Sequence, residues 1–544
     1  MAKILRSSIQ YKQPRAENLV HFIQDNLNKH SDRTLIIDSN SNTTWTGRQL
    51  YSIVSALSKH LVDVCGLCKG DVCSLYYEES DTSAILILAI VTSGGVCNFL
   101  TTSSSGRQVR DTAQVLGSKF LFSSRDLLAK IQADLLSIDD TIRVVSIDDQ
   151  CDGFKHGCRT IGHLLSQSSS LQSISGQCSR EVSIDPETDY ALIQFSSGTT
   201  GKPKPIPRTH KNLCHLVASV NHSDLMDLRP GVVLAGSLPM THRPGIWALL
   251  ACIENGSTLV IWNNLSDVED ALAMIEKYKV TIFASSLPFL SMLGSSGPKM
   301  KSRFDTSSWQ HIITAGAKIV NPDLPKSLIR EFNLRSLRQC FGMTEAGWCF
   351  LIEQSQAADN YLSVGHVVPG MEAVVLDRES ERPLEAYARG EVALRGPQVF
   401  PGYLTGESGL LNRSDFTADG WFKTGDQGYY DKDDLVFIEG RYKEIMMFEN
   451  NCLYFPNEIE AVISDHPSIE GVCVVKVAEV RVDYPYDVAR ACVTLKHGFN
   501  VTEREILDFV HEQCPQVILG GGVRILDQFP RLQNGKVDKQ ILQR

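Results

Sequence analysis

Several signatures of common protein classes are absent from this sequence. Basic residues are not in excess: the net charge is −10 over 544 residues, so nucleic acid is not expected as a partner. The 15 cysteines are scattered, and the C-x-x-C of Cys65 and Cys68 has no second Cys or His pair, so no zinc site is predicted. Thiols in this number indicate a reducing compartment instead.

Targeting and membrane-spanning signals are also sparse. The amino-terminal residues lack the apolar run of a secretory signal, and the chain does not end in the S-K-L type of peroxisomal address. Ser83–Leu100 has no charged residue, but Gly94 and Gly95 interrupt it, so we predict a buried helix and a short strand rather than a membrane span. We therefore expect an intracellular protein, cytoplasmic or organelle-associated, without a transmembrane segment; the sequence leaves its oligomeric state open.

The pattern that is present is that of a globular α/β chain. A chain of 544 residues with 43% hydrophobic content is too long to fold around a single hydrophobic core, so at least two compact units are expected. Short apolar runs alternate with helical patterns such as Val268–Tyr278, which is typical of parallel sheets covered by helices. The runs of strand length are Val72–Tyr77, Ala191–Phe195, Val232–Ala235, Thr258–Trp262, Thr281–Ala284 and Ile312–Thr314.

The carboxyl-terminal part has a different pattern, in which all elements are short. Its predicted helices and strands are Pro456–Ser464, Val472–Val477, Ala491–Lys496 and Glu503–Cys514. Such an alternation suits a small α+β domain. A boundary at Gly440, where a strand-like run meets a charged segment, divides the chain into residues 1–440 and 441–544.

The densest set of anion-binding groups lies between the strand-like Ala191–Phe195 and a predicted helix from His210 to Val220. Glycines let the backbone turn and bring N–H groups close to a ligand, hydroxyls add donors, and lysines add positive charge. The spacing of a Walker A loop is absent, so a polyphosphate site and a hydroxyl-rich turn are both open. The residues are Ser196, Ser197, Gly198, Thr199, Thr200, Gly201, Lys202 and Lys204.

This loop resembles the signature of the adenylate-forming superfamily, which contains acyl-CoA and coumarate-CoA-type ligases, nonribosomal-peptide adenylation domains and beetle luciferases. Further motifs follow in the family's order over most of the chain. The resemblance implies a large amino-terminal domain of two parallel-type sheets with helices and a small barrel-like β subdomain. A small, mobile α+β domain would follow it.

The segment Phe341–Glu345 resembles the family's Tyr-Gly-x-Thr-Glu motif. The resemblance implies that Phe341 stacks on adenine, that Gly342 belongs to the nucleotide site, that Thr344 reaches the α-phosphate and that Glu345 holds Mg²⁺. A carboxylate is a hard ligand that suits this ion. Phenylalanine in place of the usual tyrosine keeps the stacking surface and loses the hydroxyl.

Two further motifs resemble nucleotide-binding segments of the family. Gly316 and Ala317 stand where the family approaches the adenine with small residues. Asp426, in Trp-Phe-Lys-Thr-Gly-Asp, stands where the family's aspartate accepts both ribose hydroxyls, which the two oxygens of a carboxylate can do. The segment Gly390–Pro397, with Gly402-Tyr403, resembles a sheet-and-turn motif that we interpret as structural.

Four residues outside these segments complete the implied site. Arg441 and Lys443 stand in a hinge motif, where the arginine touches ribose and the lysine absorbs the backbone change as the small domain turns. Lys536 matches the carboxyl-terminal lysine that bridges the substrate carboxylate and the α-phosphate. His242 matches the histidine beside the reacting carboxylate.

The resemblance implies an ATP-dependent carboxylic acid–CoA ligase that uses ATP, Mg²⁺ and coenzyme A as cosubstrate. The acid attacks the α-phosphorus, pyrophosphate leaves, and a thiol then takes the acyl group. Both reactants are anionic, so catalysis rests on positioning and charge neutralisation. The implied catalytic residues are Lys204, His242, Thr344, Glu345 and Lys536.

The chain departs from the family pattern at two places that bear on substrate. Pro205 replaces a glycine, and Pro205–His210 resembles a stretch of aryl-acid adenylating enzymes, which favours an aromatic acid. Asn450 and Asn451 stand where the thiol tunnel usually has glycines, which weakens the inference of CoA transfer. Apolar segments with Trp348 and Phe350, which would narrow the pocket, suit a medium- or long-chain fatty acid or an aromatic acid.

Three alternatives stay open at the level of sequence. A luciferase-like monooxygenase uses the same kind of pocket. A trans-acting adenylation enzyme would load the phosphopantetheine thiol of a carrier protein. A catalytically silent homologue would bind a ligand without reaction, as the altered loop at Asn450 suggests, and it would fail pyrophosphate exchange.

Overall fold

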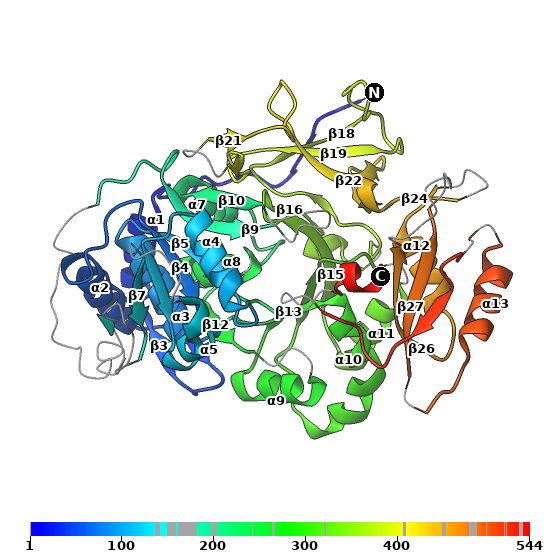
Figure 1. Cartoon of the computed structure of the whole chain (residues 1–544), viewed down its shortest axis with the longest axis horizontal. Helices are drawn as coiled ribbons and strands as arrows, with labels where there is room; N and C mark the ends of the chain where they lie inside the picture. The colour runs from blue at the N-terminus through cyan, green and yellow to red at the C-terminus, as the bar shows by residue number, and fades with distance from the viewer. Residues whose placement is uncertain are drawn as a thin grey trace.

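The computed structural model describes residues 2–544 except 136–141, 149–158, 161–181, 197–203, 242, 264–266, 320–321, 359, 406–409, 449–452, 478–486, 497, 516, 518 and 532–536. Figure 1 shows a large body of sheets and helices, an antiparallel sheet above it, and a small carboxyl-terminal domain at its right. The chain thus has the mixed α/β fold, with a large and a small domain, that the sequence predicts.

One sheet of the large body has the order β10-β9-β5-β4-β6-β7-β8. Neighbouring strands run parallel except β9 and β10, which pair antiparallel and flank the predicted phosphate loop. The strands are β4 (Val72–Tyr76), β5 (Val96–Leu100), β6 (Phe120–Ser123), β7 (Arg143–Ser146), β8 (Arg159–Thr160), β9 (Tyr190–Phe195) and β10 (Pro205–Thr209).

The second sheet has the order β17-β16-β15-β14-β13-β11-β12-β2-β3. The strands from β15 to β2 are parallel, and antiparallel strands close both edges. The strands are β2 (Thr34–Asp38), β3 (Thr44–Thr46), β11 (Val233–Gly236), β12 (Thr258–Ile261), β13 (Ile282–Ser286), β14 (His311–Ala315), β15 (Ser336–Met343), β16 (Gly347–Leu351) and β17 (His366–Val367).

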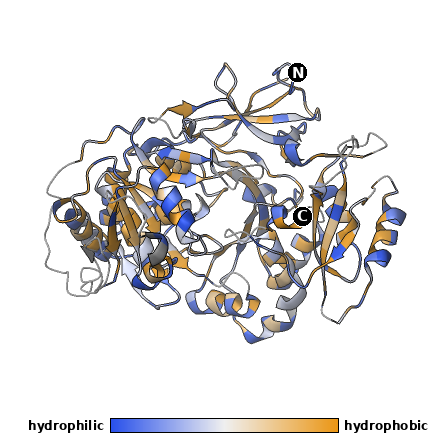
Figure 2. Cartoon of the chain, in the orientation of Figure 1, coloured by the Kyte–Doolittle hydropathy of each residue, from blue (hydrophilic) through white to orange (hydrophobic). Residues whose placement is uncertain are grey.

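Helices cover the two sheets, and the main hydrophobic cluster runs through both of them. The short α3 is apolar all round and is buried along its length, as such a helix must be (Figure 2). The helices are α1 (Leu19–Lys29), α2 (Gly47–Asp63), α3 (Asp81–Thr92), α4 (Gly106–Val115), α5 (Arg125–Leu135), α7 (His210–Ala218), α8 (Arg243–Asn255), α9 (Val268–Tyr278), α10 (Leu287–Met300) and α11 (Asp323–Phe332).

The predicted β subdomain is an antiparallel sheet of order β1-β18-β19-β22-β23 with a neighbouring hairpin, β20-β21. Phe400, Phe416, Phe422 and Tyr403 form an aromatic cluster beneath it. The strands are β1 (Leu5–Arg6), β18 (Glu372–Leu376), β19 (Gly390–Arg395), β20 (Tyr403–Leu404), β21 (Leu411–Asn412), β22 (Phe422–Tyr430) and β23 (Val436–Arg441).

The small domain has its own sheet, β26-β27-β28, and its own hydrophobic cluster between Met446 and Val523. A separate core is what allows such a unit to move as a body. Its elements are β24 (Met446–Met447), β25 (Leu453–Tyr454), α12 (Pro456–Ser464), β26 (Ile469–Lys476), β27 (Ala489–Leu495), α13 (Glu503–Gln513), β28 (Val523–Ile525) and α14 (Lys539–Leu542).

The predicted elements agree with the structure to within a few residues at each end. Ser83–Leu100 is the buried helix α3 followed by the strand β5, as predicted. Within the described residues, no helix combines the length and the apolar character needed to cross a membrane.

Shortening a buried side chain of α3 should destabilise the large domain. Leu86 is fully buried, so we expect Leu86→Ala to lower the free energy of unfolding by about 2–5 kcal/mol, because a cavity remains. Val115, 62% exposed at the end of α4, supplies the control: Val115→Ala should change stability by less than about 0.5 kcal/mol. Equal denaturation midpoints for the two variants in urea would contradict the packing described for α3.

Candidate active site

The carboxyl ends of β14 and β15 meet at one edge of the second sheet. Ligands of open α/β sheets bind at such edges, where loops diverge from the strand ends. Gly316 follows β14 with a φ of +88°, which favours glycine, and both it and Ala317 are exposed. Phe341 and Gly342, near the end of β15, are half-buried, so the two predicted adenine-binding segments lie on neighbouring strands.

Thr344 and Glu345 lie in the turn between β15 and β16. The Phe341 ring packs against Phe350, with ring centroids 5.9 Å apart, and leaves part of its surface accessible. Glu345 is 7% exposed, so its carboxylate sits at the inner wall of the site. A charge at this depth needs fixed partners.

One partner of this turn is Arg208, on β10 just after the predicted phosphate loop. Its Nη1 donates to the main-chain oxygen of Thr344 at 2.6 Å, and its Nη2 donates to the main-chain oxygen of Gln398 at 2.9 Å. Asn212, in the first turn of α7, donates from Nδ2 to the carbonyls of Pro397 (2.8 Å) and Val399 (3.1 Å). The segment after the phosphate loop is therefore joined to the turn that carries Thr344 and to the segment Pro397–Val399 that follows β19.

The two ends of the predicted phosphate loop are held together. The Ser196 N–H donates to the Lys204 carbonyl, and the Lys204 N–H donates to Ser196 Oγ, both at 3.1 Å. The residues between them lie outside the described part of the chain: Ser197, Gly198, Thr199, Thr200, Gly201 and Lys202. The Lys204 ammonium is half-exposed, 3.6 Å from the Asp415 carboxylate and 4.3 Å from the Tyr403 ring centroid.

Glu345 has two partners in the segment after β19. The Tyr403 hydroxyl donates to Glu345 Oε1 at 3.0 Å, and the Phe400 N–H donates to the Glu345 carbonyl at 2.7 Å. Burial, with the nearby Glu345 charge, raises the pKa of Tyr403 well above its usual range, so its hydroxyl keeps the proton that it donates. Sequence reasoning assigned Tyr403 to a structural motif and missed this contact, which joins residues far apart in the chain.

Asp426 and Arg441 face each other across β22 and β23. The Arg441 Nε lies 3.3 Å from Asp426 Oδ1, whereas Asp426 Oδ2 is buried with no hydrogen-bond partner among the described residues. Burial raises the pKa of Asp426 to about 6; the Arg441 charge opposes this shift, and Glu444 and Glu345 add to it. A buried carboxylate oxygen without a partner is suited to accept from a ligand hydroxyl.

The predicted hinge follows directly. Lys443 is exposed in the turn Tyr442–Glu444, and the Glu444 carboxylate accepts from the Lys539 ammonium at 3.1 Å. This contact ties the hinge to α14 of the small domain. Lys536 and the Asn450-Asn451 loop lie outside the described residues.

Only the residues next to His242 are described on the side of the site that is predicted to bind the acid. His242 lies outside the described residues, but the preceding Thr241 N–H donates to Glu79 Oε1 at 3.1 Å. Burial raises the pKa of Glu79, which lies at the carboxyl end of the β4 segment. Glu79 carried no sequence signal, because a single carboxylate after a strand belongs to no motif.

One sequence-based interpretation needs correction. Phe350 is fully buried and Trp348 is 4% exposed, so both rings belong to the core and not to an open pocket wall. Trp348 packs edge-to-face on Trp247, with ring centroids 5.0 Å apart, and Phe350 packs against Phe341.

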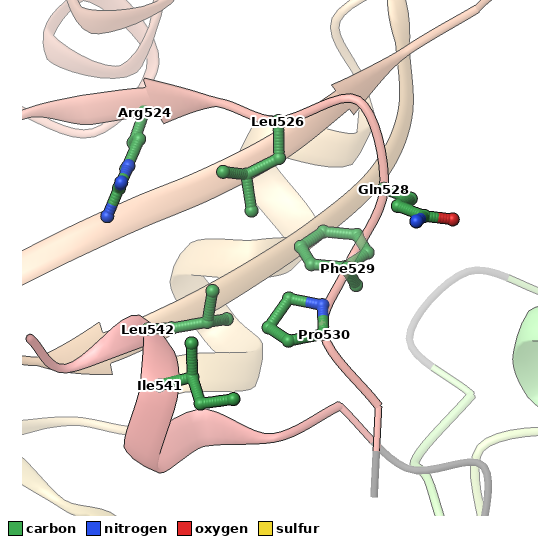
Figure 3. A pocket seen from close by; sticks show the side chains of 7 residues that line it. All are labelled: Arg524, Leu526, Gln528, Phe529, Pro530, Ile541 and Leu542. Carbon is green, nitrogen blue, oxygen red and sulfur yellow. The ribbon is translucent and has the colours of Figure 1, made fainter.

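Two surface hollows lie away from these residues. One, of about 290 Å³, is in the small domain; Phe529, Pro530, Ile541 and Leu542 face one another there, with Arg524 at the side (Figure 3). The other, of about 260 Å³, lies at the amino ends of β11, β13 and β14, opposite the edge that carries Gly316. Neither contains a residue of the candidate site.

Removing the Arg208 guanidinium should destabilise the turn that carries Thr344. We expect Arg208→Met to lower the free energy of unfolding by roughly 2–6 kcal/mol, because two buried carbonyls each lose a donor at ~1–3 kcal/mol. Arg208→Lys should lose less, since one ammonium can still reach one carbonyl. Chemical denaturation of the three proteins measures the difference, and a stable Arg208→Met variant would show that these contacts contribute nothing.

Known protein families match the large and the small domain separately. A family model described as AMP-binding enzyme matches residues 23–404, and one described as AMP-binding enzyme C-terminal domain matches residues 458–536. The chain is 28% identical to 4-coumarate–CoA ligase 2 of Petroselinum crispum, over 95% of this chain and 92% of that one. It is 29% identical to a luciferin 4-monooxygenase of Nipponoluciola cruciata, over 78% and 75%.

A solved structure shows the same fold. The ATP-bound MatB of Rhodopseudomonas palustris matches with a TM-score of 0.79 and 23% identity, covering 97% of this chain and 98% of that one. The first family model spans well over half of the chain, and the second follows it in order. This chain therefore belongs to the AMP-binding, adenylate-forming superfamily.

Proposed function

We propose that the protein is an ATP-dependent carboxylic acid–CoA ligase that forms an acyl-adenylate. The observation that carries this proposal is the linked group of Lys204, Tyr403 and Glu345, with the turn of Thr344 held beside the closed ends of the phosphate loop. A cation and a carboxylate held close to each other suit a metal–triphosphate.

The nucleotide would lie across the ends of β14 and β15. Gly316, Ala317 and the ring of Phe341 would take the adenine, with Gly342 beside it. The unpartnered Oδ2 of Asp426 would accept from a ribose hydroxyl. The phosphates would meet the loop from Ser196 to Lys202, the Lys204 ammonium and the Thr344 hydroxyl.

Glu345 would hold the magnesium ion. The described residues contain no cluster of three His, Cys, Asp or Glu side chains that could cage a metal. One buried carboxylate fits an ion that takes few protein ligands and completes its shell with phosphate oxygens and water. When bound, the ion would neutralise charge on the phosphates.

The reaction has two steps. A carboxylate oxygen of the acid attacks the α-phosphorus of ATP, the bond to the β-phosphate oxygen breaks, and pyrophosphate leaves. A thiolate of CoA then attacks the acyl carbon, and AMP leaves with the oxygen that the acid supplied. Lys204 and Lys536 would stabilise charge on the phosphate and carboxylate oxygens, and His242 would position the acid.

We further propose a boundary between residues 440 and 441, with rotation of the small domain about Lys443 between the two steps. The proposed acceptor is CoA, because coumarate–CoA ligase 2 is similar over 95% of this chain and the luciferase over 78%. The proposed acid is a medium- or long-chain fatty acid or an aromatic acid.

Acid-dependent exchange between ATP and labelled pyrophosphate tests adenylation. With a panel of fatty, aryl and heteroaryl acids, we expect exchange with at least one acid, because the first step is reversible. Lys536→Ala should reduce that exchange by at least about 100-fold, as loss of a charge-stabilising group does. No exchange with any acid of the panel would favour the silent homologue.

The pH dependence of nucleoside binding tests the role of Asp426. Folding raises this pKa to about 6, so the free protein holds a proton there at lower pH, whereas donation from ribose hydroxyls favours the ionised form. Affinity should therefore be constant above about pH 7 and fall by up to about tenfold per pH unit below pH 6.

Adenosine is the suitable probe, since it has no phosphate that titrates in this range. Calorimetry between about pH 5 and 8 should show the loss of affinity for the wild type and a flat, weak profile for Asp426→Asn. A flat profile for the wild type would remove Asp426 from the ribose site.

A further inference from the structure

The Glu345 carboxylate is fixed by a residue that the motifs leave without a role. Oε1 accepts from the Tyr403 hydroxyl at 3.0 Å, and both side chains are buried, at 7% exposure each. Gly402 precedes Tyr403 with a φ of +146° and lies close to the Asn412 carbonyl and the side chain of Arg413. The backbone on that side is therefore confined.

The Tyr403 ring is confined as well. It meets Phe400 edge-to-face at 4.8 Å between ring centroids, and Phe400 in turn packs against Phe416 and Phe422. These contacts hold the ring in a position from which its hydroxyl donates to Glu345.

The phosphate-loop lysine contacts the same ring. The Lys204 ammonium lies 4.3 Å from the Tyr403 ring centroid, within the range of a cation–π contact. Asp415 is 3.6 Å from that ammonium and limits how far it can swing. Tyr403 thus contacts one group proposed to bind metal and one proposed to bind phosphate.

We propose that Tyr403 is a positioning residue that orients the Glu345 carboxylate for a divalent cation and seats Lys204 beside the same triphosphate. The proposal rests on the proposed function of Glu345 as the metal ligand. Carboxylates that bind metals are themselves hydrogen-bonded, and loss of such an outer partner costs about 10–100-fold in metal affinity.

The contribution of the metal can be measured as a thermodynamic cycle without turnover. An ATP analogue with a methylene group between the α- and β-phosphorus, which cannot be cleaved there, is titrated calorimetrically with Mg²⁺ and with EDTA. The ratio of the two affinities is the coupling between metal and nucleotide. Tyr403→Phe should lower this ratio by about 10-fold or more and leave the metal-free affinity unchanged, because the ring beneath Lys204 remains.

A control tyrosine lies on β22 of the neighbouring sheet. The Tyr430 hydroxyl donates to the Leu384 carbonyl at 3.1 Å, and the residue is buried, at 1% exposure against 7% for Tyr403. Tyr430→Phe also removes one buried hydroxyl, so it should match the stability loss and leave the coupling ratio at the wild-type value. Tyr403→Leu, which removes the ring too, should weaken metal-free binding in addition.

The outcomes separate the two levels of inference. An unchanged coupling ratio in Tyr403→Phe, or an equal fall in Tyr430→Phe, would overturn the positioning role. A wild type that binds the analogue with strong metal coupling but supports no pyrophosphate exchange would contradict the proposed ligase function and leave the role of Tyr403 standing. A wild type without metal coupling would overturn the role of Tyr403 together with that of Glu345.

Discussion

The hydrogen bonds that join the turn after β15 to the segment after β19 are the contacts on which the rest of the site depends. Arg208 bonds a carbonyl in each, the Phe400 N–H bonds the Glu345 carbonyl, and Tyr403 bonds the Glu345 side chain. These contacts span the first sheet, the second sheet and the β subdomain. They hold the groups proposed for metal and phosphate at fixed distances before any ligand arrives, which is the condition for electrostatic catalysis.

Among the described residues, three acidic side chains of the site are opposed by few basic groups. The chain is acidic as a whole, with a net charge of −10, and Glu345, Glu444 and Asp426 gather near the hinge. Burial raises the pKa of Asp426, Arg441 opposes the shift, and the charges of Glu444 and Glu345 add to it. A nucleotide with its metal would add a positive centre beside Glu345 and hydroxyl donors beside Asp426. Ligand binding would therefore offset the free energy that burial of these carboxylates costs the free protein.

The sequence could predict the helices, strands and tight turns, because the pattern of neighbouring residues encodes them. Short apolar runs that alternate with helical patterns became strands, and Ser83–Leu100 became α3 and β5 because Gly94 and Gly95 break the run. The ends of the phosphate loop, Ser196 and Lys204, are joined as a tight loop requires.

Contacts between distant segments could not be predicted in this way. Arg208 and Tyr403 bind carbonyls and a carboxylate more than fifty residues away, and such hydrogen bonds leave no periodicity in the chain. The apolar character of Phe350 and Trp348 was equally consistent with a pocket and with a core; their packing against Phe341 and against Trp247, which is far away in the chain, places them in the core.

Isotope transfer from the acid to AMP tests the central claim most directly. The enzyme reacts an acid labelled with ¹⁸O in both carboxyl oxygens with ATP, and CoA or hydroxylamine is the acceptor. Mass spectrometry then measures the ¹⁸O content of AMP, pyrophosphate and orthophosphate. Attack on the α-phosphorus followed by acyl transfer predicts one ¹⁸O atom in AMP and none in pyrophosphate. Label in orthophosphate, with none in AMP, would mean attack on the γ-phosphorus and would contradict an acyl-adenylate intermediate.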